Sequence, residues 1–143
     1  MAGYYSSVDI TTDPIEVFKN ANISVEDFSL RDAALGENKY VFTSDEYFFG
    51  DANVRCYHND PPSLGSALYN YPCSMTAAIY DENGNIQEII FNLSGSGIVN
   101  SDKLFIPVKT GWSIQIISAS YDRSRGDTSF GAYISATAIY VSY

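Results

Sequence analysis

Basic residues and histidine are scarce in this sequence of 143 residues. It has eight Lys and Arg together and a single histidine, against 17 Asp and Glu, which gives a net charge of −9. A nucleic-acid-binding face needs clustered Lys and Arg to neutralise phosphates, and an anionic membrane surface selects the same residues. The composition therefore predicts neither nucleic acid nor membrane as a partner, and the acidity favours solubility.

Long apolar runs are also missing, and no stretch approaches the ~20 residues of a membrane-spanning helix. The first residues, Met1 to Tyr5, lack the basic segment and apolar stretch of a secretory signal. We therefore expect assembly in the cytoplasm, where thiols are normally reduced. The two cysteines, Cys56 and Cys73, allow a disulfide but do not imply one.

The residues needed for common catalytic and metal sites are few. Any histidine mechanism must use His58, which could share a strand face with Cys56, but nothing marks either side chain as activated. Structural zinc takes four ligands at recognisable spacing, and these two residues with Cys73 do not supply them. Carboxylates paired in space for glycoside hydrolysis stay open, although neighbours such as Asp45 and Glu46 are expected on solvated turns. We expect no metal, no cofactor and no enzymatic activity.

What the sequence does have is a high content of strand-forming residues. Hydrophobic residues make up 45% and aromatic residues 15%, with 12 Tyr and 8 Phe. The length fits a single domain over residues 1–143. Residues 1–38 read as irregular, with a short helix that starts at Asp13 as N-cap and ends near Lys19 or Asn20. For residues 26–35, helix and strand both remain open.

From residue 39 onward the pattern predicts antiparallel strands. The best-defined element is a hairpin of strands 74–80 and 86–93, because the Asn83-Gly84 pair suits a tight turn. Gly50 is read as a turn, and residues 94–97 as a flexible connection. In the second hairpin strand, Gln87, Ile89, Phe91 and Leu93 are predicted to face inward. The other predicted strands are 40–42, 46–49, 53–57, 103–108, 112–120 and 132–141, the last apolar on both faces as if buried between two layers. This spacing indicates an all-β sandwich or barrel.

Tyr, Ser, Asn and Gly are abundant, as in surfaces that recognise ligands through rigid aromatic and adaptable polar groups. Sugars are bound by aromatic platforms with polar rims, and the aromatic candidates outside the obvious core are Tyr69, Tyr71, Trp112 and Tyr121. The simpler interpretation of any one tyrosine is that it suits a strand. The tripeptide Arg125-Gly126-Asp127, which integrins read, falls in a polar loop and fits an ordinary hairpin loop better.

Three segments resemble bacteriophage tail-fibre and receptor-binding head domains. They are residues 104–116 (LFIPVKTGWSIQI), the hairpin 78–85 (AIYDENGN) and the terminal strand 136–143 (ATAIYVSY). The sequence departs from the usual pattern at Trp112, where a small acidic residue is typical. The resemblance covers about a third of the chain and transfers no functional residue. It implies a jelly-roll-like β-sandwich of antiparallel strands, often trimeric, displayed on a virion assembled in the host cytoplasm.

The expected function is thus a non-enzymatic virion structural protein, either a receptor-binding tail-fibre head or a capsid decoration protein. Its expected partners are other copies of itself, other virion proteins and a glycan of the host surface. The alternative is a carbohydrate-binding module or lectin that acts as a monomer. An enzyme of the cupin or glycosidase kind and a small capsid jelly roll are further possibilities, and the mass in solution separates the monomeric from the assembled ones.

Overall fold

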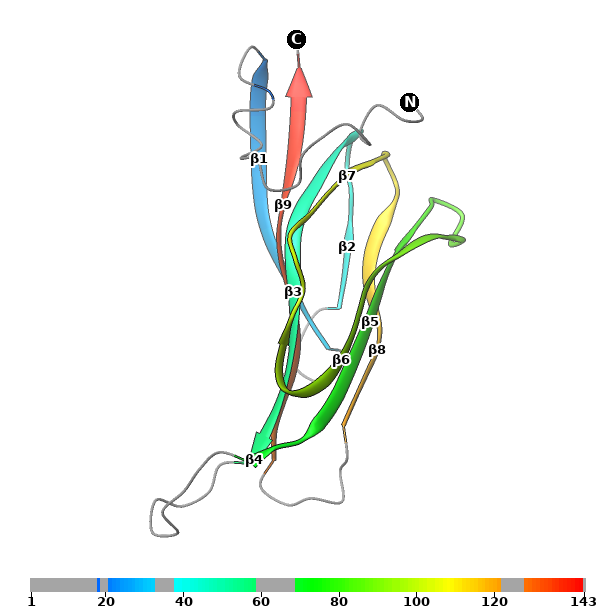
Figure 1. Ribbon diagram of the computed structural model, residues 1–143. Helices are drawn as coiled ribbons and strands as arrows, with labels where there is room; N and C mark the ends of the chain where they lie inside the picture. The colour runs from blue at the N-terminus through cyan, green and yellow to red at the C-terminus, as the bar shows by residue number, and fades with distance from the viewer. Residues whose placement is uncertain (1–17, 19–20, 33–37, 59–68, 122–127, 143) are drawn as a thin grey trace.

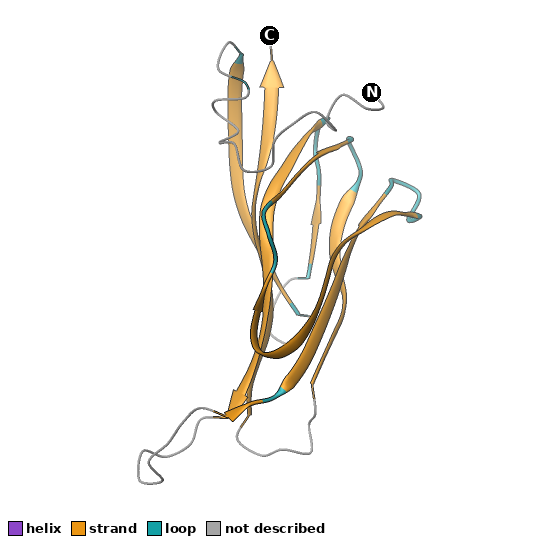
Figure 2. Ribbon diagram, in the orientation of Figure 1, coloured by secondary structure: helices purple, strands orange, loops and turns teal. Residues whose placement is uncertain are grey.

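The computed structural model describes residues 18, 21–32, 38–58, 69–121 and 128–142, and every regular element in these ranges is a β-strand (Figures 1 and 2). The strands are β1 (Asn22–Arg31), β2 (Lys39–Val41), β3 (Glu46–His58), β4 (Tyr69–Asn70), β5 (Pro72–Tyr80), β6 (Ile86–Asn100), β7 (Leu104–Val108), β8 (Ser113–Tyr121) and β9 (Thr128–Ser142). The predicted all-β fold is confirmed. The helix predicted from Asp13 lies outside the described residues, apart from Phe18.

The strands form one antiparallel sheet in the order β1-β9-β3-β6-β5-β8-β2, with β4 and β7 also paired to β3. Strand β6 joins two halves of this sheet, because residues 86–96 pair with β5 and residues 97–100 pair with β3. Gly97, at a φ of 76°, lies where the strand passes from one partner to the other. We call the strands β1, β9, β3, β4 and β7 the β9 half, and β2, β8, β5 and the start of β6 the β5 half.

The two ends of the sheet, β1 and β2, meet through side chains. The rings of Phe28 and Tyr40 stack with centroids 3.9 Å apart, and the Tyr40 hydroxyl donates to Glu26 Oε2 at 3.1 Å. The sheet is therefore a nearly closed barrel. The jelly-roll-like sandwich expected from the resemblance is not confirmed by this arrangement.

The core fills the space between the two halves. Phe48, Val54 and Cys56 of β3 face Met75 and Ile79 of β5, and all five are at least 98% buried. Full burial of a side chain such as Phe48 stabilises the fold by roughly 1.5–3 kcal/mol. These residues occupy alternate positions along their strands, as the pleat requires.

Strand β1 corrects the prediction of an irregular segment over residues 1–38. Its ten residues pair with β9 from Asn22 opposite Ser142 to Arg31 opposite Tyr133. Phe28 and Leu30 face the core, while Asp27, Ser29 and Arg31 face solvent. The segment was ambiguous because its hydrophobic positions are few, and the partner strand lies at the far end of the sequence.

Two predicted breaks are wrong. Gly50 is not a turn but the fifth residue of the continuous strand β3, where it lies opposite Ala136. Residues 94–97 are not a flexible connection but part of β6. In both places glycine permits close approach or bending within a strand, which a sequence pattern does not distinguish from a turn.

The hairpin of β5 and β6 is confirmed, and Gly84 takes the positive φ of 84° that its turn needs. The predicted inward face of β6 is correct for Phe91 and Leu93, which pack in or against the core, but wrong for Gln87 and Ile89, which are exposed, Ile89 to 46%. A bulge explains this, because Ala77 pairs with Phe91 and Ala78 with Ile89, which leaves Ile90 as an extra residue. The prediction for the last strand is also corrected, since one face of β9 packs on the core while Ser135 on the other face is exposed.

Candidate functional site

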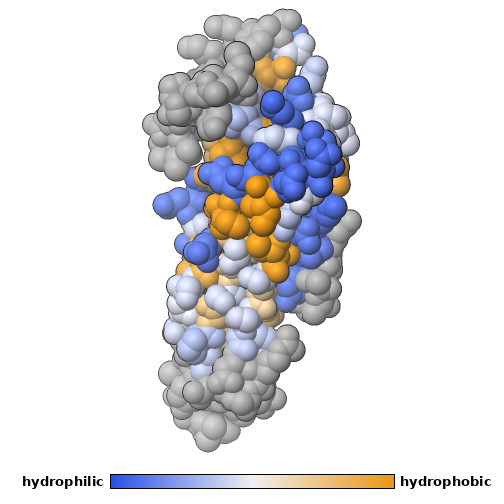
Figure 3. Space-filling model, turned by 90° about the vertical axis from the view of Figure 1, so that its right-hand side faces the viewer, coloured by the Kyte–Doolittle hydropathy of each residue, from blue (hydrophilic) through white to orange (hydrophobic). Residues whose placement is uncertain are grey.

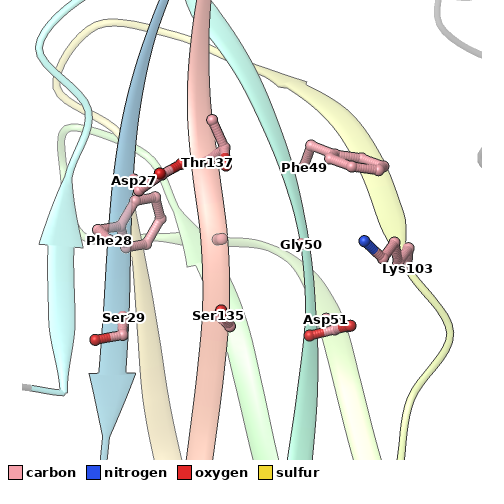
Figure 4. A pocket seen from close by; sticks show the side chains of 10 residues that line it. Asp27, Phe28, Ser29, Phe49, Gly50, Asp51, Lys103, Ser135 and Thr137 are labelled. Carbon is pink, nitrogen blue, oxygen red and sulfur yellow. Dashed lines mark hydrogen bonds between the residues drawn. The ribbon is translucent and has the colours of Figure 1, made fainter. Parts of the chain in front are cut away.

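The outer face of the β9 half has a groove built from two rows of side chains across three strands (Figure 4). In the first row, Asp27 of β1 lies opposite Thr137 of β9, which lies opposite Phe49 of β3. In the second row, the cross-strand neighbours are Ser29, Ser135 and Asp51. Directly opposite residues have Cβ atoms ~4.5–5.5 Å apart, so each row is a continuous line of functional groups. We call this surface, completed by Lys103, the outer groove.

The floor of the outer groove lies between the two rows, where Phe28, Ala136 and Gly50 occupy the intervening positions. A Cβ at Gly50 would lie 2.5 Å from the Ser135 carbonyl oxygen and 2.6 Å from the Ala136 Cβ. Glycine is therefore required for the close approach of β3 and β9. The resulting hollow has a volume of about 510 Å³ and opens to solvent.

One hydrogen bond fixes the geometry of the first row. The Thr137 hydroxyl donates to Asp27 Oδ1 at 2.7 Å (Figure 4). An ionised carboxylate can accept about four hydrogen bonds, so Asp27 keeps acceptor capacity for a ligand while Thr137 holds its orientation.

An aromatic ring and a cation flank the groove on the β3 side. The Phe49 ring packs at a tilt against Phe105, with centroids 5.6 Å apart. Lys103 Nζ lies 5.2 Å from the centroid of the Phe49 ring, within the range of a cation–π interaction. The groove thus combines an apolar ring, two carboxylates, hydroxyl groups and an ammonium group.

A third row continues the same face below the outer groove. It consists of Arg31, Tyr133 and Asn53, again direct cross-strand neighbours. The guanidinium carbons of Arg31 and Arg55 lie 5.6 Å and 5.2 Å from the centroid of the Tyr133 ring. Arg55 Nη2 donates to Asn53 Oδ1 at 3.3 Å. We call Arg31, Asn53, Arg55 and Tyr133 the arginine–tyrosine cluster.

Glycine also shapes this cluster. A Cβ at Gly131 would lie 2.4 Å from the Tyr133 hydroxyl oxygen and 2.5 Å from a ring carbon. The Tyr133 ring therefore lies over Gly131 along its own strand, and it is within 5.6 Å of the guanidinium carbons of both arginines.

The chemistry of this surface suits a ligand rich in hydroxyl groups. Carboxylates accept hydrogen bonds, serine and threonine hydroxyls both donate and accept, and an aromatic ring covers an apolar patch. All of these groups except Lys103 stand on paired strands, which hold them more rigidly than loops do. Among the described residues, no group of three or more His, Cys, Asp and Glu is placed to hold a metal ion.

Three of the four aromatic residues predicted to bind ligand lie away from the outer groove. Tyr71 and Tyr121 are half-buried and pack against the core at the end of the molecule where Tyr121 pairs with Cys73. Trp112 is also packed against the core, but it precedes the other end of β8, about 30 Å away along the strand. Tyr69 is in β4, and its side chain is outside the described part. Tyr71, Trp112 and Tyr121 are not among the described residues that line the outer groove, and the ligand-binding role of all four stays a prediction.

Tyr121 does border a smaller hollow of about 410 Å³ on the β5 half, and four of its eight lining residues are serines. Its ring stacks on Phe130 with centroids 4.4 Å apart and planes 19° apart. Stacking and core contacts use part of the ring surface that a sugar would need. The hollow is a weaker candidate than the outer groove for this reason.

The outer face of the β5 half has a different character. Figure 3 shows apolar side chains gathered in the middle of this side of the molecule, with hydrophilic ones above them. Ile86, Ile89 and Ile117 are 52%, 46% and 38% exposed, and the last two lie beside bulges in β6 and β8. These exposed isoleucines distinguish this face from the outer groove, whose described lining contains no isoleucine.

The two cysteines are buried thiols that face the core. Burial raises the pKa of the Cys73 thiol, and the nearby Cys56 raises it further. A raised thiol pKa makes the nucleophilic thiolate rarer. The side chain of His58 and the Arg125-Gly126-Asp127 tripeptide lie outside the described part of the chain.

One pattern in the sequence is consistent with the outer groove. Asp27, Ser29 and Arg31 alternate with Phe28 and Leu30, which is the pattern of a strand with one polar face. The partners of this face come from β9 and β3, so only the register of the sheet brings the groups together.

Comparison with known proteins did not place this chain in a family: no family model matches it, and no curated protein matches its sequence. No helix in the described ranges is long and apolar enough to cross a membrane.

Proposed function

We propose that this chain is a non-enzymatic receptor-binding domain of a virion, of the tail-fibre-head or decoration type, and that the outer groove binds a carbohydrate of the host surface. The observation that supports this proposal is the composition of the groove. Phe49 offers a ring, Asp27 and Asp51 offer acceptors, and Ser135 offers a hydroxyl, all from adjacent strands. This is the set of groups that sugars need, an apolar platform with a polar rim.

The resemblance of the segments 78–85, 104–116 and 136–143 to phage receptor-binding heads supports display on a virion, assembled in the host cytoplasm. A homotrimer that contacts other virion proteins belongs to the same proposal. The proposal also includes a jelly-roll-like arrangement of the strands. Strand β6, which belongs to both halves of the sheet, is the element to compare with the strands of a jelly roll.

The second candidate is a carbohydrate-binding module that acts as a monomer. One observation favours it: the outer groove is formed by β1, β9, β3 and Lys103 of a single chain. A groove of this kind needs no second copy to be complete.

Light scattering on a sizing column at two protein concentrations, followed by a glycan array, tests both candidates. A trimer that binds glycans supports the receptor-binding head, whereas a monomer that binds them supports the second candidate. Asp51→Ala should abolish glycan binding, and Ser118→Ala, an exposed position of β8, should leave it unchanged. Failure to bind any glycan with the fold intact contradicts carbohydrate recognition in both forms.

A further inference from the structure

The arginine–tyrosine cluster concentrates positive charge on an acidic protein. The chain has a net charge of −9 and only eight basic residues. Two of its four arginines nevertheless lie beside the same ring, that of Tyr133. Counted with Lys103, the described outer face of β1, β9 and β3 has three cations and two carboxylates, a net of +1.

Within the described part of the chain, the contacts of the two guanidinium groups do not neutralise their charge. Arg31 is exposed and lies over the Tyr133 ring. Arg55 contacts the same ring and donates to a neutral amide oxygen of Asn53. Its Nε is buried and has no hydrogen-bond partner among the described residues. A guanidinium group held by a ring and an amide keeps its charge and several donors for an anion.

The cluster is continuous with the outer groove. Arg31, Tyr133 and Asn53 each stand two positions along their strand from Ser29, Ser135 and Asp51. Two residues of a strand span about 6.6 Å. A sugar ring whose hydroxyls bond the second row therefore places a substituent within reach of the third row.

On this basis we propose that the ligand of the outer groove is an acidic glycan, in which an anionic substituent, carboxylate or sulfate, binds the arginine–tyrosine cluster. The inference rests on the proposed carbohydrate binding and names its ligand class. Hydroxyl groups of the same sugar would bond Ser135 and Asp51, while the anion would accept from Arg31 and Arg55. The acidic protein would repel such a ligand elsewhere, so the cluster selects both the ligand and its orientation.

The test is a printed array of neutral, carboxylated and sulfated glycans, followed by titration of the best ligand and its matched neutral counterpart. Sialyllactose, sulfated lactose and lactose form such a set and distinguish a carboxylate from a sulfate. Arg31→Gln should weaken binding of the acidic glycan about tenfold, as expected for loss of one charge-assisted hydrogen bond. Lys39→Gln, an exposed cation of β2 in the β5 half, is the matched control and should leave the affinity unchanged.

Arg55 is half-buried, so Arg55→Lys is preferred to alanine, and circular dichroism with a thermal melt reports on its fold. This variant keeps the charge but loses the forked donor geometry, and it should reduce acidic-glycan binding while leaving neutral-glycan binding as it was. Higher salt should weaken the acidic complex more than any neutral one.

The outcomes separate the two proposals. Equal binding of neutral and acidic glycans, unaffected by Arg31→Gln, overturns the acidic-glycan inference and leaves the proposed function standing. Binding of no glycan by a folded protein overturns the proposed function, and the inference with it.

Discussion

The hydroxyl of Tyr40 donates a hydrogen bond to Glu26 Oε2 at 3.1 Å, across the seam where the two ends of the sheet meet. Tyr40 belongs to β2 and Glu26 to β1, which share no backbone pairing in the strand order. Together with the stacked rings of Phe28 and Tyr40, this bond brings the barrel near to closure.

Tyr40→Phe should keep the ring stack and lose the hydrogen bond. We expect the free energy of unfolding to fall by roughly 0.5–1 kcal/mol, the usual net value of one hydrogen bond. Urea denaturation measures the change.

Burial, and next the bond to Glu26, raise the pKa of Tyr40 to about 12. The folded state therefore holds this proton more tightly than the unfolded chain, and the stability it provides is lost as pH rises from 10 through 12. Absorbance titration of the wild type should show one phenol that ionises at a pH of about 12. This phenol should be missing from the titration of Tyr40→Phe.

Glu46→Gln should stabilise the protein at neutral pH. Glu46 is only 8% exposed, its Oε1 has no hydrogen-bond partner in the described residues, and burial raises the pKa of its carboxyl. Because the folded state favours the protonated form, ionisation of Glu46 weakens the fold, and stability should rise as pH falls through this raised pKa. Thermal melts of both proteins between pH 4 and 8 check this. A lower melting temperature for Glu46→Gln at pH 7 would contradict it.

Gly50→Ala should separate β3 from β9 and damage the outer groove. The added Cβ would meet backbone and Cβ atoms at 2.5–2.6 Å, and overpacking of this kind costs about 1–3 kcal/mol. Gly95→Ala is the comparison variant, because its Cβ would meet one methyl group of Val99 at 2.8 Å and no backbone atom closer than 4.0 Å. Gly50→Ala should lower the free energy of unfolding, measured by chemical denaturation, far more than Gly95→Ala does. Glycan binding is the second measurement and should show the same difference. Equal behaviour of the pair would show that the close approach at Gly50 is dispensable.

Asp81→Asn should weaken the β5–β6 hairpin and remove part of the acid sensitivity of the protein. Asp81 Oδ1 accepts from the backbone N–H groups of Asn83 and Asn85 at 2.8 Å and 2.9 Å. The Asn85 bond foremost, and then other backbone N–H groups of the turn, lower the pKa of Asp81. The stability that this carboxylate provides is thus present above its ordinary pKa near 3.8 and is lost as pH falls through the lowered value. Thermal melts between pH 6 and 2 should show a shallower acid decline for the variant, and hydrogen exchange should show faster opening at the turn.

The sequence predicted the parts of this fold that depend on local signals. The Asn83-Gly84 turn and the flanking strands are read from neighbouring residues, and the all-β class follows from the abundance of strand formers. Strand β1 and the outer groove depend instead on partners far along the chain. Asp27 meets Thr137, and Ser29 meets Ser135, only because β1 and β9 pair.

Glycine and bulges account for the remaining errors. Gly50 has the same appearance in a sequence whether it ends a strand or allows a close approach within one. The extra residue Ile90 turns Ile89 from the inward to the exposed face, and the alternation of hydrophobic residues in the sequence does not indicate this bulge. The tyrosines and tryptophan predicted to bind ligand are selected by residue type. Half of the ten residues that line the groove are instead short polar ones, which only the register of the sheet brings together.

The position of β9 has a consequence for biosynthesis. This strand is the last in the sequence, yet it lies between β1 and β3 in the sheet and supplies the pairing partner of both. While the chain is still being translated, β1 has no strand to pair with and one edge of β3 is uncovered. The β5–β6 hairpin and β8 can pair at that stage, but the β9 half must wait until translation has passed residue 142 and the strand has emerged from the ribosome. The newly made chain thus passes through a stage with open strand edges, and low temperature or a holding chaperone during expression should raise the yield of folded protein.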